Sequence, residues 1–307
     1  MAMLIGFEEY RKQARLLAAE AGMAYADVAI HHFPDEESLV RLPTDLADEV
    51  VLCRSLDHPN TKLIELVLAA AEARELGARR LTLVAPYLCY MRQDRAFHSG
   101  EAVSQKVIGR LLAEYFDAVI TVDPHLHRVH HLAEAVPARR AVALTAMAPI
   151  AAFLQRHVRH ALLVGPDRES EQWVAAVAER AGMDYVVGEK VRLGDREVEI
   201  HLNGDFADRE VVLIDDVAST GRTLEVAANI ALAGGAGSVS VMVTHALFVE
   251  DAVARLEKAG VSHIWSTDSI PHESNAVPLA PLLASALAET EENDHAPVED
   301  PDQSSSR

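Results

Sequence analysis

The chain has few cysteines, and this scarcity limits what it can be. Only two of its 307 residues are cysteines, Cys53 and Cys89, and both lie in apolar stretches of sequence. We therefore expect two reduced, buried thiols of a cytoplasmic protein. A disulfide framework or a cysteine-based metal site is excluded by so small a number.

Basic residues and long apolar runs are also scarce. The 28 Lys and Arg residues face 47 Asp and Glu residues, which gives a formal net charge of −19. A surface of this sign repels nucleic-acid phosphates, so we expect no nucleic acid as a partner. No apolar run approaches the length of a membrane span, so we expect no membrane partner. Charged residues among the first dozen positions also predict that no signal peptide is present.

What the chain does contain is enough apolar sequence for two domains. Half of the residues are hydrophobic, and 307 residues suffice for two domains of ordinary size. Apolar strand patterns alternate with helical patterns, for example at residues 161–165, 169–181 and 184–188. This alternation predicts an α/β fold with mostly parallel sheets.

The domain division follows from two similar strands. Residues 119–123 and 211–216 each form an apolar run that ends in aspartate. We place the boundary near residues 142–148, with an N-terminal domain at 1–145 and a C-terminal domain at 146–288. The acidic, serine-ended residues 289–307 bury too little apolar surface to fold, so we expect a disordered acidic tail.

The most informative segment is VVLIDDVASTGRT, residues 211–223. Its four apolar residues predict a strand that is buried on both faces. Asp215 and Asp216 follow, and a helical pattern begins at Leu224. A strand end, a short loop and a helix N-terminus form an anion site, where N–H groups and hydroxyls hold a phosphate. The two acids repel phosphate, so they suit sugar hydroxyls or a metal-bound polyol. The segment therefore predicts a site for a phosphorylated sugar.

Two further segments carry arginines or acids at positions where we expect loops. The run Arg92-Gln93-Asp94-Arg95 follows a strand, and arginine clamps phosphate or stacks on a base. The alternative is a surface loop with ion pairs. Phe33, Asp35 and Glu37 belong to the turn FPDEE, for which an ordinary turn is the alternative.

Four more residues fit a metal or phosphate site. His125 and Asp167 each follow an apolar strand; histidine is a common ligand of metals, and an acid can hold Mg²⁺ through water. A structural role is the alternative for both. Lys190 and Arg192 lie two residues apart, so an extended segment points both to one side, where they neutralise a migrating phosphoryl group. A solvated basic turn is the alternative.

Together these segments resemble ribose-phosphate pyrophosphokinase, the synthetase of phosphoribosyl pyrophosphate (PRPP), and in particular its archaeal-type class. Order and spacing match over residues 4–285. The segments YMRQDRAFHSGEAVSQKVIGRLL, EKVRL and DDVASTGRT each have counterparts in that family. The last of them alone indicates only the type I phosphoribosyltransferase fold. The RQD and FPDEE segments and the two-domain length make the resemblance specific to the synthetase.

The resemblance implies two similar phosphoribosyltransferase-type domains, each a mostly parallel sheet flanked by helices. It also implies a reaction in which ATP donates its β,γ-diphosphate to the 1-hydroxyl of ribose 5-phosphate, giving PRPP and AMP. Mg²⁺ is the implied cofactor, and a homo-oligomer built from dimers is the implied assembly.

The resemblance further implies roles for individual residues. The catalytic cations of a flexible loop are Lys190 and Arg192. The residues that bind ribose 5-phosphate are Asp215 and Asp216 at the hydroxyls, and Ser219, Thr220, Gly221, Arg222 and Thr223 at the phosphate. The residues that bind ATP are Arg92, Gln93, Asp94 and Arg95, together with Phe33, Asp35 and Glu37 from a neighbouring subunit. The positions associated with Mg²⁺ are His125 and Asp167.

The chain departs from the family pattern at two places. The family loop usually reads TGGT, and here Arg222 replaces the second glycine, where it either crowds the loop or adds a phosphate contact. Residues 168–171, Arg-Glu-Ser-Glu, lack the usual glycine-bearing run. Two alternatives therefore stay open: a phosphoribosyltransferase that consumes PRPP, and a regulatory, catalytically weak subunit.

Overall fold

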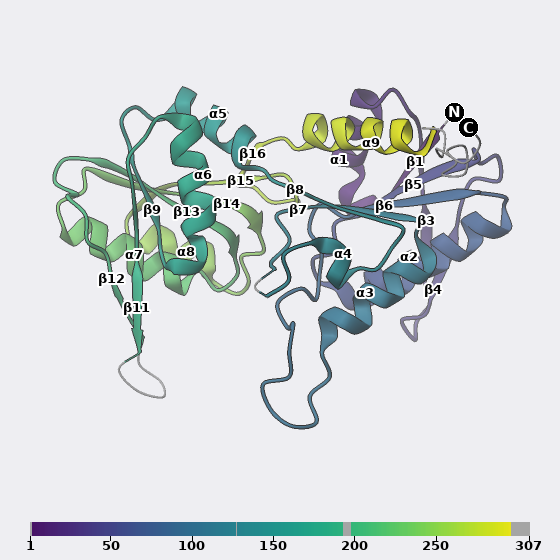
Figure 1. Ribbon diagram of the computed structural model, residues 1–307, viewed down its shortest axis with the longest axis horizontal. Coiled ribbons are helices and arrows are strands. Elements are labelled where there is room, and N and C mark those ends of the chain that lie inside the picture. Colours follow the sequence, from purple (N-terminus) through teal and green to yellow (C-terminus); the bar gives the residue numbers. More distant parts are fainter. Residues whose placement is uncertain (1, 127, 193–197, 296–307) are drawn as a thin grey trace, which may run out of the picture.

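The computed structural model describes residues 2–126, 128–192 and 198–295, and it contains two α/β domains side by side (Figure 1). The strands of the first sheet are β1 (Ala2–Gly6), β2 (Ala24–Asp27), β5 (Glu49–Cys53), β6 (Arg80–Val84), β7 (Ala118–Val122) and β8 (Arg140–Leu144). The strands of the second sheet are β9 (Leu162–Gly165), β10 (Tyr185–Val187), β13 (Glu210–Ala218), β14 (Ser238–Ala246), β15 (Val261–Thr267) and β16 (Asn275–Val277). Every pairing within both sheets is parallel, which confirms the predicted fold class.

The two domains repeat one topology. The first sheet has the order β2-β1-β5-β6-β7-β8, and the second has the order β10-β9-β13-β14-β15-β16. An antiparallel hairpin is inserted after the second strand of each domain. These hairpins are β3 (Ala29–His32) with β4 (Ser38–Arg41), and β11 (Glu189–Arg192) with β12 (Val198–His201). The segments that carry Phe33 and Lys190 are therefore equivalent elements of two similar halves.

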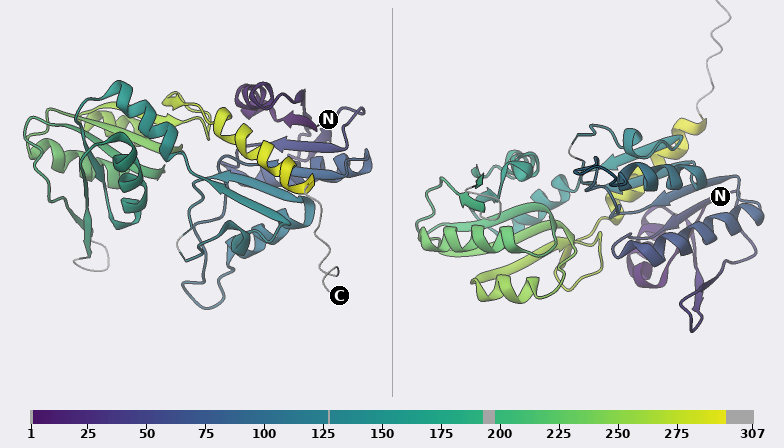
Figure 2. Two further views of the ribbon diagram at one scale, coloured as in Figure 1. Left: turned by 45° about the horizontal axis from the view of Figure 1, so that its top comes forward. Right: turned by 90° about the horizontal axis from the view of Figure 1, so that it is seen from below.

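Helices cover both faces of each sheet (Figure 2). They are α1 (Arg11–Glu20), α2 (Pro59–Glu75), α3 (Ser104–Tyr115), α4 (Leu132–Ala135), α5 (Met147–His157), α6 (Glu171–Ala181), α7 (Arg222–Ala233), α8 (Ala252–Lys258) and α9 (Ala280–His295). In β13, Val212 and Ile214 pack on the α5 and α6 side, whereas Val211 and Leu213 pack on the α7 and α8 side. A strand buried on both faces needs the unbroken apolar run seen in the sequence.

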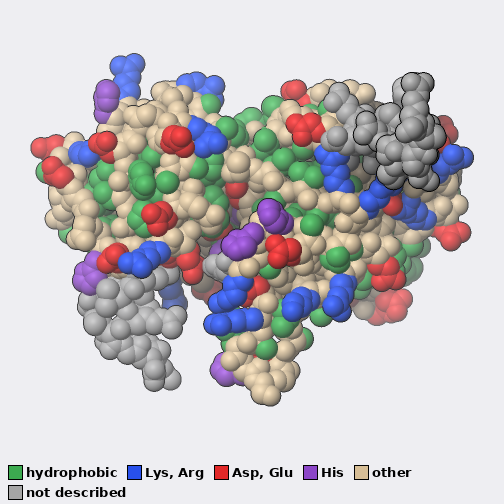
Figure 3. Space-filling model, in the orientation of Figure 1, with side chains coloured by type: hydrophobic (Ala, Val, Ile, Leu, Met, Phe, Trp, Pro, Cys, Tyr) green, Lys and Arg blue, Asp and Glu red, His purple; other side chains and the backbone are tan. Residues whose placement is uncertain are grey.

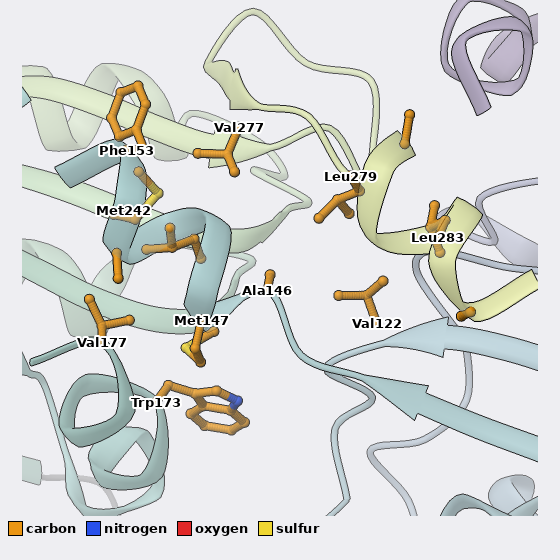
Figure 4. Close-up of a cluster of buried hydrophobic side chains, with 14 of the residues drawn as sticks. Val122, Ala146, Met147, Phe153, Trp173, Val177, Met242, Val277, Leu279 and Leu283 are labelled. Carbon is orange, nitrogen blue, oxygen red and sulfur yellow. The ribbon is translucent and has the colours of Figure 1, made fainter. Parts of the chain in front are cut away.

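The C-terminal helix crosses back to the first domain. Helix α9 lies against α1, and Leu283 shares one core with Leu4 and Tyr10. That core continues through the joint between the domains, where Val122 and Leu279 lie opposite Met147 (Figure 4). Residues 280–288, which we expected in the second domain, therefore pack on the first.

The end of α9 also differs from expectation. The helix continues to His295, so residues 289–295 are helical where we expected a disordered tail. These residues include Glu289, Glu291 and Glu292, and glutamate favours helix, so they prolong the alanine- and leucine-rich start of α9. Residues 296–307 of the expected tail lie outside the described residues. None of the helices in the described parts of the chain combines the length and apolarity that crossing a membrane requires. Both cysteines are free and buried.

A buried ion pair fixes the base of the β3–β4 hairpin. Arg54 Nη2 donates to Glu65 Oε2 at 2.6 Å, and the two side chains are 4% and 2% exposed. From the hairpin, Ser38 Oγ donates to Glu65 Oε1 at 2.9 Å, and His32 Nε2 lies 2.7 Å from the same oxygen. Burial opposes ionisation, but these partners hold the pKa of Glu65 below its ordinary value.

Replacing Glu65 with glutamine is expected to lower the free energy of unfolding by about 3–5 kcal/mol at neutral pH, because it leaves Arg54 buried without that partner. A carboxyl with a lowered folded pKa stabilises the fold above its ordinary value of about 4.3 and loses this effect as the pH falls. Urea titrations should therefore show that the difference in the free energy of unfolding between wild type and Glu65→Gln becomes smaller in acid. The matched control is Glu72→Gln on the exposed face of α2. Equal losses of stability in Glu65→Gln and Glu72→Gln would contradict a stabilising role for the Arg54–Glu65 pair.

Candidate active site

The two adjacent acids lie within a strand. We expected the strand at residues 211–216 to end at these acids, but it continues two residues beyond them, to Ala218. Strand β13 pairs with β14 as far as Ala218, opposite Ala246. This pairing supplies hydrogen-bond partners to the backbone beyond the acids, so the strand continues. Asp215 and Asp216 therefore sit at the carboxyl end of the second sheet, where open α/β sheets bind ligands.

A cavity of about 210 Å³ opens at this end of the sheet. Both domains contribute to it. Its lining comprises Arg92 and His125 from the first domain, and Asp167, Glu169, Asp215, Asp216 and residues 217–224 from the second. The structure thus brings together one expected ATP residue, both expected metal residues and the whole expected sugar-phosphate loop.

The N-terminus of α7 forms the anion-binding wall of this cavity. Gly221 precedes the helix with a φ of +71°, a left-handed conformation that favours glycine. Arg222 is the first residue of α7, two residues before the expected helix start, and it is exposed. Arg222 is not among the residues with positive φ, so the family's second glycine is replaced without backbone strain. Its guanidinium adds a positive charge at a helix N-terminus that already favours anions.

Asp216 binds across the joint to the first domain. Its Oδ2 atom lies 2.6 Å from His125 Nδ1, and its Oδ1 accepts from Val217 N at 2.7 Å. Asp216 is 3% exposed. Burial opposes its ionisation, but the bond to His125 holds the pKa of Asp216 below its ordinary value. This carboxylate thus fixes a first-domain histidine at the edge of the cavity.

Asp215 has a different environment. It is partly exposed, and its Oδ1 accepts from Asp216 N at 3.0 Å. Burial together with the nearby carboxylates of Asp216 and Asp167 raises the pKa of Asp215 well above its ordinary value. A cluster of acids of this kind is a place where a cation or sugar hydroxyls relieve the repulsion.

Asp167 caps the segment that departs from the family pattern. Its Oδ1 accepts from the backbone N–H groups of Glu169 and Ser170 at 3.0 and 3.3 Å. Residues 168–170 form a 3₁₀ turn before α6, where we expected the helix itself to begin. In the described parts of the chain, no group of three or more His, Cys, Asp or Glu side chains has the arrangement of a complete metal site.

Only one residue of the RQD segment lines the cavity. Gln93 accepts from Ser104 Oγ at 3.0 Å. The Asp94 side chain is 3% exposed and accepts from Arg128 Nη1 at 2.7 Å. The guanidinium of Arg95 lies 5.3 Å from the centre of the Phe97 ring. Gln93 and Asp94 therefore hold the loop in place, and Arg92 lines the cavity.

The remaining expected ATP residues lie far from this cavity. Phe33, Asp35 and Glu37 are exposed on the turn between β3 and β4. That hairpin stands at the end of the first domain that is remote from the second domain (Figure 1). These three residues therefore do not reach the cavity of their own chain.

The expected catalytic cations lie on the equivalent hairpin of the second domain. Lys190 and Arg192 both belong to β11, so their backbone is extended. The prediction that both point to one side requires such an extended backbone. Their side chains, and residues 193–197 between the strands, lie outside the described part of the chain.

Sequence reasoning missed several polar groups near the site. A second cavity of about 670 Å³ adjoins His125, and its lining includes Asp123, Arg168 and Trp173. Here the first domain carries Lys, Arg and His side chains where it faces the second domain (Figure 3). The sequence marked Asp123 only as the acid at the end of a strand, and it directly follows β7.

Comparison with known proteins identifies the family. Residues 2–115 match the N-terminal domain of ribose phosphate pyrophosphokinase, and residues 174–282 match the phosphoribosyl synthetase-associated domain. The ribose-phosphate pyrophosphokinase of Methanopyrus kandleri is 35% identical over 289 residues, which cover 93% of this chain and 98% of that protein. The chain belongs to the ribose-phosphate pyrophosphokinase family.

Two further relatives of this pyrophosphokinase family agree. The ribose-phosphate pyrophosphokinase of Methanothermobacter thermautotrophicus is 31% identical, over 93% of this chain and 99% of that protein. This organism and M. kandleri are archaea, as the archaeal-type resemblance predicts. The crystal structure of phosphoribosylpyrophosphate synthetase from Mycobacterium smegmatis superposes with a TM-score of 0.82 at 23% identity, over 95% of this chain and 99% of that one. It confirms the fold.

Proposed function

We propose that this protein transfers the β,γ-diphosphate of ATP to the 1-hydroxyl of ribose 5-phosphate, giving PRPP and AMP. The observation that carries the proposal is the composition of the 210 Å³ cavity. It joins an anion site at the start of α7, the acids of β13 and the first-domain residues Arg92 and His125. A phosphoribosyltransferase would not need the first-domain part of this lining.

The cavity suggests how the substrates lie. The hydroxyls of Ser219, Thr220 and Thr223 and the first N–H groups of α7 hold the sugar phosphate, and Asp215 accepts from the ribose hydroxyls. Arg92 faces the triphosphate from the other domain, and Lys190 and Arg192 arrive on β11. Diphosphoryl transfer needs positioning and charge neutralisation more than a covalent nucleophile, and this arrangement supplies both.

We also propose Mg²⁺ as the cofactor. The donors fit a hard cation, because Asp167, Asp215 and Asp216 offer oxygen atoms and the raised pKa of Asp215 is what a bound cation would reverse. Mg²⁺ commonly takes one or two carboxylates together with substrate phosphates and water. Asp167 and the His125 edge of the cavity would hold it, and the ion would neutralise charge on the diphosphate.

Product analysis by phosphorus NMR tests this function. Purified protein with ATP, ribose 5-phosphate and Mg²⁺ should form AMP and PRPP in equal amounts. Release of pyrophosphate from PRPP and a base, without AMP formation from ATP, would instead show a phosphoribosyltransferase. Binding of both substrates without turnover would show a regulatory subunit.

We further propose that the enzyme is a homo-oligomer whose subunits complete one another's sites. Large apolar side chains stand exposed on the first domain near the hairpin, including Leu39 on β4 and Ile64 and Leu68 on α2. Helix α2 packs against β4, so these side chains form one face, which suits a protein interface. A second copy on this face would bring a Phe33 turn towards a neighbour's ATP.

Replacing Phe33 with alanine is expected to raise KM for ATP about tenfold, the loss that follows when a base no longer stacks on an aromatic ring. KM for ribose 5-phosphate should stay unchanged. Mixing Phe33→Ala with Lys190→Ala protein under conditions that exchange subunits should restore activity, because one site of the mixed dimer then has both residues. A mixture no more active than its components would rule out sharing between subunits.

A further inference from the structure

Polar side chains are buried at the joint between the domains, outside the residues assigned to the substrates. Asp123 follows β7 in the first domain, and Thr244, His245 and Ser269 belong to the second domain. They are between 0% and 7% exposed. Buried polar groups destabilise a fold unless they are hydrogen-bonded, so their partners show what they hold in place.

Asp123 is held in an unusual conformation. Its φ is +36°, in the left-handed region that non-glycine residues rarely adopt. Its Oδ2 accepts from Ala146 N at 3.0 Å and from Thr244 Oγ1 at 3.1 Å, and its N–H donates to Leu144 O at 2.8 Å. Strained residues of this kind persist where their surroundings over-determine them. The turn that leads to His125 is therefore fixed by partners in both domains.

His245 supplies a bond to the backbone of the same turn. Its Nε2 lies 3.2 Å from Asp123 O, and a carbonyl only accepts, so Nε2 carries a proton and donates. Burial lowers the pKa of His245 to about 4, so the ring is neutral at neutral pH. Its Nδ1 then accepts from Ser269 Oγ at 2.9 Å. Ser269 Oγ also lies 2.8 Å from Thr244 O, but Thr267 Oγ1 donates to the same carbonyl at 2.7 Å. Because that carbonyl has a second donor, the single Ser269 proton can turn to the ring.

The geometry of the joint connects His245 to the cavity. Asp123 lies two residues before His125, and His125 Nδ1 lies 2.6 Å from Asp216 Oδ2. The second domain thus holds the Asp123–His125 turn through several bonds. Ala146 N and Thr244 Oγ1 bind the Asp123 carboxyl, His245 binds the Asp123 carbonyl, and Asp216 pairs with His125. Loss of the His245 bond removes the contact to the backbone of the turn and would let that backbone shift relative to Asp216.

We propose that His245 is a positioning residue, which fixes the Asp123–His125 turn of the first domain against the ribose 5-phosphate domain so that His125 meets Asp216. This inference rests on the proposed function for its kinetic consequences. The sugar-phosphate loop at residues 219–223 lies wholly within the second domain. A shifted turn should therefore impair turnover and leave the binding of ribose 5-phosphate intact.

His245→Leu and His245→Gln test this role. The leucine variant keeps the volume but loses the donor, and kcat is expected to fall about tenfold, the worth of one hydrogen bond in the site. KM for ribose 5-phosphate should change less than about twofold, because that loop is intact. The glutamine amide can donate from nearly the position of Nε2, so it should restore most of kcat. Thr244→Val, which removes only the bond to the Asp123 carboxyl, should also lower kcat.

A matched control separates positioning from general destabilisation. Val241 lies on the same strand, buried in the second-domain core. Val241→Ala should lower the melting temperature and leave kcat within about twofold, since it touches no group of the turn. The proposal is overturned if His245→Leu and His245→Gln are equally impaired, or if all loss of activity follows melting temperature across the four variants.

Amide hydrogen exchange tests the joint without turnover. Peptides covering Asp123 and Ala146 should exchange faster in His245→Leu than in wild type, and at the wild-type rate in His245→Gln. Unchanged exchange in the leucine variant would overturn the proposal. A wild-type protein that makes no AMP from ATP would refute the diphosphokinase function alone, and the exchange result would still decide the role of His245.

Discussion

Replacing Lys190 with alanine is expected to lower kcat about 100- to 1,000-fold while KM for ribose 5-phosphate stays within about threefold. The ε-ammonium is proposed to meet the negative charge that develops on the diphosphate as it moves between oxygens. A cation that acts there stabilises the transition state more than the bound substrates. The proposed sugar-phosphate site lies on other elements, at the end of β13 and the start of α7, so the affinity for the sugar phosphate should not depend on Lys190. Steady-state measurement of AMP formation at varied ribose 5-phosphate checks both numbers.

Two further variants sharpen this test. Lys190→Arg keeps the charge and should retain far more activity than Lys190→Ala. Val191→Ala is the matched control, because Val191 lies between the two cations in the sequence and carries no charge, and it should stay within about threefold of wild type. Equal losses in kcat and in affinity for ribose 5-phosphate would show that Lys190 binds the ground state, contrary to the proposed role.

The parts of the fold that sequence predicted are those with a local signature. The apolar run at residues 211–214 predicted a doubly buried strand, and the structure packs its alternate residues on opposite faces. The end of that strand was wrong because it depends on pairing. The backbone of Asp215 to Ala218 stays extended because β14 lies alongside. The local sequence of these residues does not predict that pairing.

The parts of the site that sequence left unconnected depend on contacts between distant segments. His125 and Asp216 are 91 positions apart, and Asp123 and Thr244 are 121 apart. The RQD run predicted a ligand loop, but which of its side chains reaches the cavity was decided by Ser104 and Arg128, which bind Gln93 and Asp94. His245 went unnoticed because a histidine in an apolar strand resembles an ordinary core residue until its partners are known.

Substitutions of the two adjacent acids of β13 are expected to change different kinetic constants, KM for Asp215 and kcat for Asp216. Asp215→Asn should raise KM for ribose 5-phosphate about 10- to 100-fold, because a hydrogen bond to a charged group is worth roughly 1.5–3 kcal/mol. Asp215 is partly exposed to the cavity, so its carboxylate can meet the sugar hydroxyls. Asp216 is nearly inaccessible and is bound to His125 and to Val217 N. Asp216→Asn should therefore act on kcat, by loosening His125, more than on KM.

The comparison is decisive because the two substitutions are identical in chemistry and one residue apart. Both replace a carboxyl with an amide in the same cavity, so a general effect of that replacement would change both variants alike. Steady-state kinetics with ribose 5-phosphate, together with direct binding of the sugar phosphate by calorimetry, separates the two signatures. If Asp215→Asn binds ribose 5-phosphate as tightly as wild type does, the exposed acid does not hold the sugar. The strand end would then serve the metal alone, and the hydroxyl contacts would have to come from the residues at the start of α7.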